Sequence, residues 1–159
     1  MANGTAFKLV TPTRVVFDGD ATLVIAVTTE GEEGILPKHA PFLAALKPGI
    51  LRANVLRQTL DGVHPERSRG AQGDKASDGA TSRLELATSE GFMQALPDRI
   101  TVLVDEALAF DDVVVAEARE RLAAATERQK GAAGGSDAYA REQAAIDFAS
   151  AQLRLTGHR

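Results

Sequence analysis

The sequence predicts a β + α protein, in which a strand-rich N-terminal part precedes an antiparallel pair of C-terminal helices. Up to about residue 105 the chain is rich in Val, Leu, Thr and Gly, in short runs separated by turn residues. All six prolines lie in this part, whereas fifteen of the last 54 residues are alanine. Because alanine is the best helix former and proline the worst, we expect a β-sandwich domain at 1–105 and a helical hairpin at 106–159.

Nine segments of the first part have strand character, since short apolar runs are bounded there by turn residues. Alternation is clearest at residues 83–86, where leucines occupy one face and charges the other. Many short strands with frequent turns are typical of a sandwich or flattened barrel. The predicted strands are 6–10, 14–17, 21–28, 34–36, 42–45, 49–56, 83–87, 91–96 and 99–104.

Residues 58–82 do not fit this pattern, because they are polar, mixed in charge and without a period. Unstructured loops of this length are uncommon inside a compact domain, so we expect a flexible loop insertion. His64, Arg67 and Arg69 lie close together there and suit a binding arm. A surface insertion is the favoured interpretation, since lengthening a loop costs little entropy.

The alanine-rich tail predicts two helices. Asp111 and Asp112 suit the start of the first, because carboxylates cap free amides at the positive end of a helix. The glycines at 131–135 break the pattern, and Ser136 with Asp137 caps the second helix. The residues at helical spacing are Val114, Ala118, Leu122 and Ala125, then Tyr139, Ile146, Ala149 and Leu153. Since alanine buries little apolar area, at about 25 cal/mol per Å², we expect a weakly held hairpin that can detach and extend.

The composition excludes several classes of function. The hydrophobic fraction of 44% and the charged fraction of 25% are ordinary for a globular protein. No run approaches the roughly 18 apolar residues of a spanning helix, and the N-terminus lacks an export signal. A net charge of −4 and 4% aromatic residues argue against nucleic-acid binding. The default expectation is therefore a cytoplasmic protein.

Signatures of catalysis are also missing from the sequence. There is no phosphate-binding glycine loop, nucleophile elbow or dinucleotide fingerprint, and no cysteine for a thiol nucleophile or thiolate metal site. His39, His64 and His158 have no ligand spacing. The acidic residues at 30–33 suit an acid/base pair or a cation, but a solvated turn is the favoured interpretation. We expect no enzyme activity, no metal and no cofactor.

Several motifs follow one another in a definite order and cover nearly all of the chain except residues 58–82. The most specific is Glu-Gly-Glu-Glu-Gly-Ile-Leu-Pro-Lys-His-Ala-Pro at 30–41, followed by Leu-Lys-Pro-Gly at 46–49. The others are Phe-Lys-Leu-Val-Thr-Pro at 7–12, Val-Phe-Asp-Gly at 16–19, Ala-Thr-Ser-Glu-Gly-Phe at 87–92, Leu-Pro-Asp-Arg-Ile-Thr-Val-Leu-Val-Asp at 96–105, Asp-Ala-Tyr-Ala at 137–140 and Ala-Gln-Leu-Arg-Leu at 151–155. In this order they resemble the epsilon subunits of bacterial F-type ATP synthases.

The resemblance implies a ten-stranded sandwich with a C-terminal helical hairpin. It also implies a non-catalytic rotor subunit in the central stalk of a proton-translocating ATP synthase, peripheral on the cytoplasmic face of the bacterial inner membrane. The sandwich would then couple the gamma subunit to the c-ring. The helices, when extended, would reach the alpha and beta subunits of the catalytic head and inhibit ATP hydrolysis.

Site residues follow from the resemblance position by position. It places Glu30, Glu32, Glu33, Lys38 and His39 at the c-ring interface. It assigns contacts with acidic groups of the catalytic head to arginines of the regulatory helices, namely Arg119, Arg121, Arg128, Arg141 and Arg154. Lys38 replaces the glycine usual before the histidine, so lysine is strained there if that position has a positive φ, unless the loop has shifted.

Some family members bind ATP through an Ile/Leu-Asp-x-x-Arg-Ala motif at the first helix. Here the matching positions are Asp112, Val115 and Ala116, so a valine stands in place of the arginine. Without that guanidinium we expect weak or absent ATP binding.

Two other classes remain as alternatives to a rotor subunit: a free-standing β-sandwich binding module with a helical dimerisation tail, and a small hydrolase using the carboxylates at 30–33.

Overall fold

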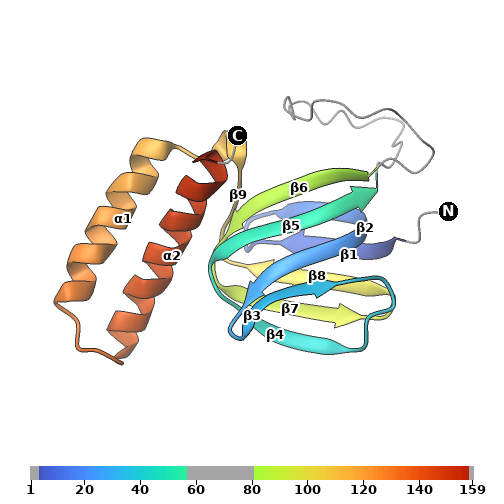
Figure 1. The fold of residues 1–159 in the computed structure, drawn as a ribbon, viewed down its shortest axis with the longest axis horizontal. Coiled ribbons are helices and arrows are strands. Elements are labelled where there is room, and N and C mark those ends of the chain that lie inside the picture. The colour runs from blue at the N-terminus through green and yellow to red at the C-terminus, as the bar shows by residue number, and fades with distance from the viewer. Residues whose placement is uncertain (1–3, 57–80, 158–159) are drawn as a thin grey trace.

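Nine strands of the described chain form one sheet that folds back on itself as a sandwich, with two helices packed at one side (Figure 1). The computed structural model describes residues 4–56 and 81–157. The strands are β1 (Thr5–Val10), β2 (Val15–Thr28), β3 (Gly31–Ile35), β4 (Phe42–Leu46), β5 (Gly49–Leu56), β6 (Thr81–Thr88), β7 (Gly91–Leu96), β8 (Arg99–Val104) and β9 (Ala107–Ala109). The predicted β + α class is confirmed, with nine strands in the described residues instead of the ten that the resemblance implies.

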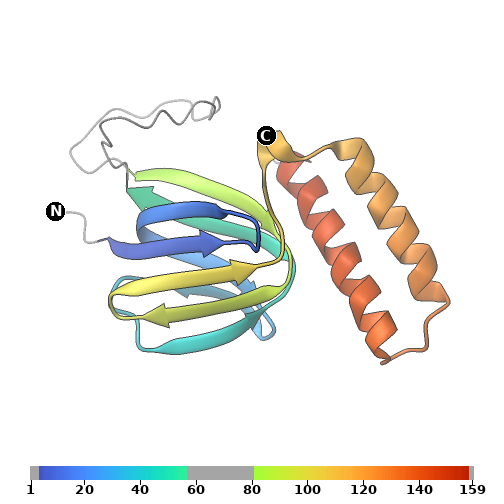
Figure 2. The ribbon, with the colours of Figure 1, turned by 180° about the vertical axis from the view of Figure 1, so that it is seen from behind.

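The sandwich closes because β1 pairs on both of its edges. It runs antiparallel to the first half of β2 and parallel to β8. The sheet order is β1-β8-β7-β4-β2-β5-β6-β9, with β3 added to the second half of β2. Seen from behind, β8 and β7 lie in the layer opposite β5 and β6 (Figure 2).

The predicted strands at 14–17 and 21–28 are in fact one strand, β2. Asp18 and Gly19 carry a turn signal, but they pair with Lys8 and Phe7 of β1 and stay extended. The Lys8 ammonium also lies 3.2 Å from the Asp18 carboxylate. Pairing across the sheet therefore overrides the local turn preference of Asp-Gly.

Both boundaries drawn around the predicted loop and domain shift slightly. Strand β6 begins at Thr81, so residues 81–82 belong to the sheet. The rest of the predicted insertion, with His64, Arg67 and Arg69, lies outside the described residues. After residue 105, β9 pairs with the end of β6. The sandwich therefore continues to Ala109, four residues beyond the predicted boundary.

The core lies between the two layers and comes from alternating residues of each strand. Phe7 and Leu9 of β1 are fully buried, and the Phe7 ring lies 5.3 Å from that of Phe17. The other large, fully buried side chains are Val24, Ile35, Leu51, Met93, Ile100 and Val102. Close backbone approach also matters, because a Cβ on Gly91 would collide with the carbonyl oxygen of Leu103.

Three helical elements follow β9: η1 (Phe110–Asp112), α1 (Val115–Lys130) and α2 (Asp137–Gly157). The predicted cap of the second helix is confirmed, since the Tyr139 amide donates to Ser136 Oγ at 3.2 Å. The predicted start of the first helix is wrong. Asp111 and Asp112 form the 3₁₀ turn, and Val114 stands at the N-cap of α1 without a side-chain cap. Val113 and Val114 are extended, as β-branched residues prefer.

The hairpin is attached to the sandwich mainly through α2, and α1 lies on the outside (Figures 1 and 2). On α1 the predicted stripe is partly right: Ala118 and Ala125 are buried and Leu122 is half-buried, but Val114 is exposed and precedes the helix. On α2 the predicted stripe is only partly right: Ala149 is buried, but Tyr139 is exposed. The C-terminal half of α2 forms a docking cluster with the sheet, made of Ala87, Phe148, Ala151 and Leu155 and flanked by Ile50, Leu108, Phe110 and Val113.

Candidate functional site

The residues predicted to face a c-ring do not form one loop. Glu30 lies at the turn between β2 and β3, Glu32 and Glu33 lie on β3, and Lys38 and His39 follow it. At about 3.3 Å per residue, the five residues of β3 separate the two ends of this set by roughly 17 Å. The structure therefore offers two separate patches, an acidic hairpin tip and the β3–β4 loop.

Glu32 is already paired within the chain. Its carboxylate accepts a hydrogen bond of 2.7 Å from Arg52 Nη2 on β5. The pair spans β2, because Ile25 of β2 pairs with Arg52 on one edge and with Gly34 on the other. An exposed pair of this kind is worth below about 1 kcal/mol, so another cation can replace Arg52 at little cost.

The β3–β4 loop is held in a strained conformation. Lys38 has φ of 64°, and it is the only residue other than glycine with a positive φ among those described. Of the two possibilities left open for this position, strain or a shifted loop, the structure has the positive φ, at a cost of about 1 kcal/mol. The Lys38 amide donates to the Pro97 carbonyl at 3.2 Å, which ties the loop to the β7–β8 turn.

His39 is fixed by its immediate neighbours. Its Nδ1 lies 2.8 Å from the Ala40 carbonyl oxygen, and its ring meets Phe42 edge-on with the centroids 6.0 Å apart. A hydrogen bond of 3.1 Å from its amide to the Leu36 carbonyl closes the loop. No ionisable partner is near enough to make it an acid/base pair among the described residues.

The five arginines of the predicted regulatory set have different surroundings. Arg121 lies 3.8 Å from Glu106, which joins α1 to the end of the sandwich. Arg128 Nε donates to Glu142 at 3.0 Å across the hairpin, and this hydrogen bond and charge raise the pKa of Arg128. Arg141 Nε donates to the carbonyl of Asp137 at 3.4 Å.

Arg119 and Arg154 are exposed, and neither has an ion pair with any residue that the structure describes. Within the part of the chain that the structure describes, Arg121 is the one arginine of the five that is paired with the sandwich. Detachment of the hairpin therefore breaks one ion pair of this set and leaves the Arg128–Glu142 pair intact.

The three positions of the degenerate ATP motif lie at the end of η1 and the start of α1. Asp112 ends η1, where its carboxylate lies 4.0 Å from Arg14 Nη2. Val115 begins α1, and Ala116 is exposed on its first turn. Among the described residues no group of His, Cys, Asp and Glu is placed to hold a metal ion.

An apolar outer face on β4, β7 and β8 was missed by the sequence reasoning. Leu43 is 70% exposed, Phe92 59% and Leu103 51%. Phe92 pairs directly with Ala45 on one side and with Leu103 on the other, and Leu103 pairs with Val10 of β1. The alternation along β7 was the available signal for this face. Because Met93 and Ala95 are buried, Phe92 must lie on the opposite, outer side of the strand.

A groove of about 980 Å³ continues this apolar face toward the hairpin. Ala45, Phe92 and Leu103 form its sheet wall, and Tyr139 and Ala144 of α2 line the other side. Its rim carries one basic and three acidic side chains, namely Lys47, Glu90, Asp105 and Asp147. The groove therefore suits an apolar segment flanked by basic residues.

A smaller groove of about 450 Å³ lies between the hairpin and the end of the sandwich. The sandwich side presents Glu90, Asp105 and Glu106, and the hairpin side presents Arg121, Arg128 and Arg141. Opposite charges thus face each other across the junction, which adds a salt-sensitive attraction to the apolar docking cluster.

The first strands match the family model described as the beta-sandwich domain of the ATP synthase Delta/Epsilon chain, over residues 5–63. The fold also resembles a chain in the cryo-EM structure of Euglena gracilis mitochondrial ATP synthase, OSCP/F1/c-ring in rotational state 1. The TM-score is 0.64 at 16% identity, covering 98% of this chain and 82% of that one. The family model thus matches the first part of the sandwich, and the solved structure shows a similar fold.

Full-length relatives narrow the class further. The ATP synthase epsilon chain of Chromobacterium violaceum is 32% identical over 147 residues, 92% of this chain and 89% of that protein. That of Moorella thermoacetica is 30% identical over 150 residues, 94% of each. The chain belongs to the ATP synthase epsilon chain family. The resemblance carried by its ordered motifs is confirmed.

Proposed function

We propose that this chain is a rotor subunit of the central stalk of a proton-translocating F-type ATP synthase. In this function it has no active site of its own and is peripheral, on the cytoplasmic face of the bacterial inner membrane. Its membership of the epsilon chain family supports the proposal, since relatives match over more than nine tenths of this chain. Neither helix described by the structure has the length and hydropathy needed to cross a membrane.

The exposed face at Leu43, Phe92 and Leu103 is the observation that carries this function. Single exposed apolar residues need no explanation, but three on neighbouring strands that lead into a groove mark an interaction surface. We assign this face to the gamma subunit. The acidic rim of the groove calls for basic residues on the segment of gamma that occupies it.

The opposite partner is the c-ring. Two patches are available to polar loops of the ring. The first is the tip of the β2–β3 hairpin, with Glu30, Glu32 and Glu33, and the second is the β3–β4 loop, with Lys38 and His39. Because Glu32 gives up only a weak pair with Arg52, it can bind a cationic group of the ring without a large loss. Contact at two separated patches resists rotation of the sandwich on the ring better than contact at one.

The hairpin acts as a brake on ATP hydrolysis in this proposal. Its docking cluster is small, and undocking leaves most of the charges on α1 and α2 available to the alpha and beta subunits. Arg119 and Arg154 have no ion pair within the described residues. Both can therefore bind acidic groups of the alpha and beta subunits without losing such a contact.

Binding of the gamma subunit tests the assigned face. The variant Phe92→Asp places a charge in the apolar face, and we expect at least about tenfold weaker binding, as for a central interface residue. Val114→Asp is the matched control, because Val114 is 53% exposed on the segment before α1 and outside this face. Equal binding by both variants contradicts the assigned face. Absence of binding by the unchanged chain contradicts the rotor function and favours the free-standing module.

ATP hydrolysis tests the brake separately. A catalytic head lacking this subunit is titrated with the unchanged chain, with the double variant Arg119→Gln/Arg154→Gln, and with Arg99→Gln as a sandwich control. We expect the unchanged chain and the control to slow hydrolysis and the double variant to slow it less. If none of them slows hydrolysis although all bind gamma, the chain couples the stalk without braking it.

A further inference from the structure

The turn between β1 and β2 fixes the position of Arg14. The amide of Thr11 donates to the Arg14 carbonyl at 2.9 Å, and Thr11 Oγ1 donates to the same oxygen at 3.2 Å. The Arg14 amide in turn lies 3.3 Å from Thr11 Oγ1. Thr11 itself is buried. The backbone of Arg14 is thus tied to the sandwich on both its amide and its carbonyl side.

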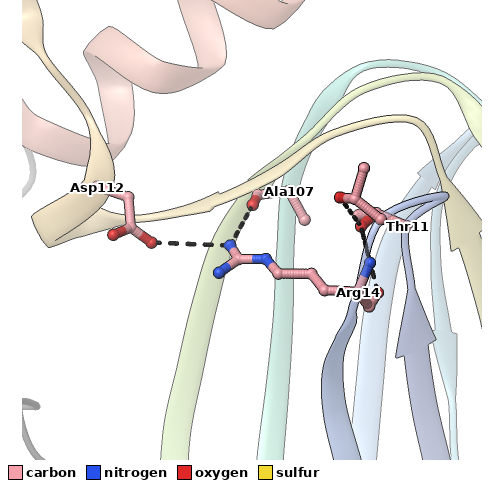
Figure 3. Close-up of polar contacts among 5 residues, drawn as sticks. Thr11, Arg14, Ala107 and Asp112 are labelled. Carbon is pink, nitrogen blue, oxygen red and sulfur yellow. Dashed lines mark hydrogen bonds and ion pairs between the residues drawn. The ribbon is translucent and has the colours of Figure 1, made fainter.

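The Arg14 side chain reaches from this turn to the connection between sandwich and hairpin (Figure 3). Its Nη2 donates to the carbonyl of Ala107 at 3.4 Å and lies 4.0 Å from Asp112 Oδ2. Ala107 is in the last strand of the sandwich, and Asp112 ends the 3₁₀ turn that leads to α1. One guanidinium therefore contacts both sides of the connection.

The connection is the part of the chain that must move if the hairpin leaves the sheet. Strand β9 has three residues and pairs with β6. After η1, Val113 and Val114 are extended, and the N-cap of α1 has no side-chain hydrogen bond. A side-chain contact on this short connection therefore acts on the docking equilibrium.

We propose that Arg14 and Asp112 form an electrostatic latch that biases the hairpin toward its docked position. This proposal rests on the proposed function in one respect, namely that the hairpin can detach from the sandwich. In this proposal the chain pivots after β9, so that Asp112 moves with the hairpin and Arg14 stays with the sandwich. The Ala107 carbonyl orients the guanidinium in both positions, because it belongs to the part that does not move.

The latch is weak, which suits a reversible device. The side chains of Arg14 and Asp112 are 56% and 52% exposed, so the solvent screens their attraction. Exposed pairs of this kind change an equilibrium by about two- to fivefold. Since the Debye length falls to about 3 Å at 1 M salt, the bias should disappear there.

Distances between spin labels on the free, full-length chain measure this equilibrium. The chain has no cysteine, so Gln94→Cys on β7 and Ala123→Cys on α1, both exposed, report the docked and undocked populations. All variants carry Phe148→Ala, which weakens the docking cluster and raises the undocked population into the measurable range. The control is Lys8→Gln, because the Lys8–Asp18 pair is similarly exposed and lies within the sandwich.

We expect Arg14→Gln and Asp112→Asn each to raise the ratio of undocked to docked chain by about two- to fivefold, and the double variant to add nothing further. The swap Arg14→Asp with Asp112→Arg should restore the original ratio. The latch is overturned if Asp112→Asn behaves like Lys8→Gln, if the two effects multiply in the double variant, or if the difference persists at 1 M salt.

ATP hydrolysis separates failure of the latch from failure of the brake. If the ratio shifts as expected but the catalytic head is not inhibited more strongly, the latch stands and the braking function fails. If the head is inhibited while the ratio does not respond to either substitution, the brake stands and the latch is overturned.

Discussion

The two apolar clusters of this protein differ in size and in the elements that they join. The sandwich core contains Phe7, Leu9, Met93 and Ile100, which are at most 1% exposed and come from three strands of the closed sheet. The docking cluster has four buried residues and joins α2 to the outer side of the sheet. Phe148, its largest member, is still 8% exposed.

The sandwich core therefore stabilises the fold, whereas the docking cluster stabilises the position of the helical hairpin on the sheet. Loss of the sandwich core exposes both layers at once, because the strands are paired around the whole sandwich. Loss of the docking cluster frees a hairpin whose two helices stay together through Ala118, Ala125 and the Arg128–Glu142 pair.

The largest effect is expected from Ile100→Ala in the sandwich core. Large-to-small substitutions at fully buried positions cost about 2–5 kcal/mol, so chemical denaturation of the variant should give a free energy of unfolding lower by that amount. The hairpin is unchanged by this substitution. An unchanged free energy of unfolding for Ile100→Ala would contradict the assignment of this cluster to the stability of the fold.

Phe148→Ala should act on docking and leave the sandwich intact. Exposing a buried phenylalanine costs about 2 kcal/mol, so we expect faster amide exchange at the β6 face and the segment after β9, with unchanged exchange in β1 and β8. Leu155→Met is the conservative control, since it keeps most of the apolar volume. A fall in sandwich stability equal to that of Ile100→Ala contradicts the separation of the two clusters.

The division into sandwich and hairpin was predictable because it depends on local properties. Proline ends at residue 97 and alanine becomes abundant beyond 105, and these preferences act within a few residues. Strand β9 was not predictable, since Ala-Leu-Ala has no strand preference of its own and is extended only because β6 lies beside it. The same holds for Asp18 and Gly19, which β1 keeps extended.

The candidate site was predictable in its residues and less so in its geometry. The motif at 30–41 identified the acidic tip and His39, but not the partner of Glu32, because Arg52 is twenty residues away and the two meet only through pairing on β2. Arg14 had no sequence signal at all. Its partners lie far along the chain: Ala107 in strand β9 is 93 positions away and Asp112 in η1 is 98 positions away.

A smaller effect, of opposite sign, is expected from Lys38→Gly in the β3–β4 loop. Glycine relieves the positive φ but loses more chain entropy on folding, so the net gain in sandwich stability should be about 0.5 kcal/mol. Lys47→Gly is the matched control, since Lys47 is also exposed and in a turn but has no positive φ. It should be neutral or destabilising. Thermal unfolding of the two variants decides, and an equal shift in both means that Lys38 is not strained.

The smallest effect is expected from Glu142→Gln, which removes the Arg128 pair within the hairpin. The pKa of Arg128 is raised in the folded chain by Glu142. A raised folded-state pKa gives stability that is complete below the unfolded pKa and is lost only as the pH rises through the folded pKa. Arginine stays protonated to well above pH 10, so the difference in melting temperature between variant and unchanged chain should be the same at pH 7 and pH 9.5. A difference that shrinks in 1 M salt but not with pH identifies the pair as an electrostatic contact between the two helices. A difference that changes between pH 7 and pH 9.5 contradicts this assignment.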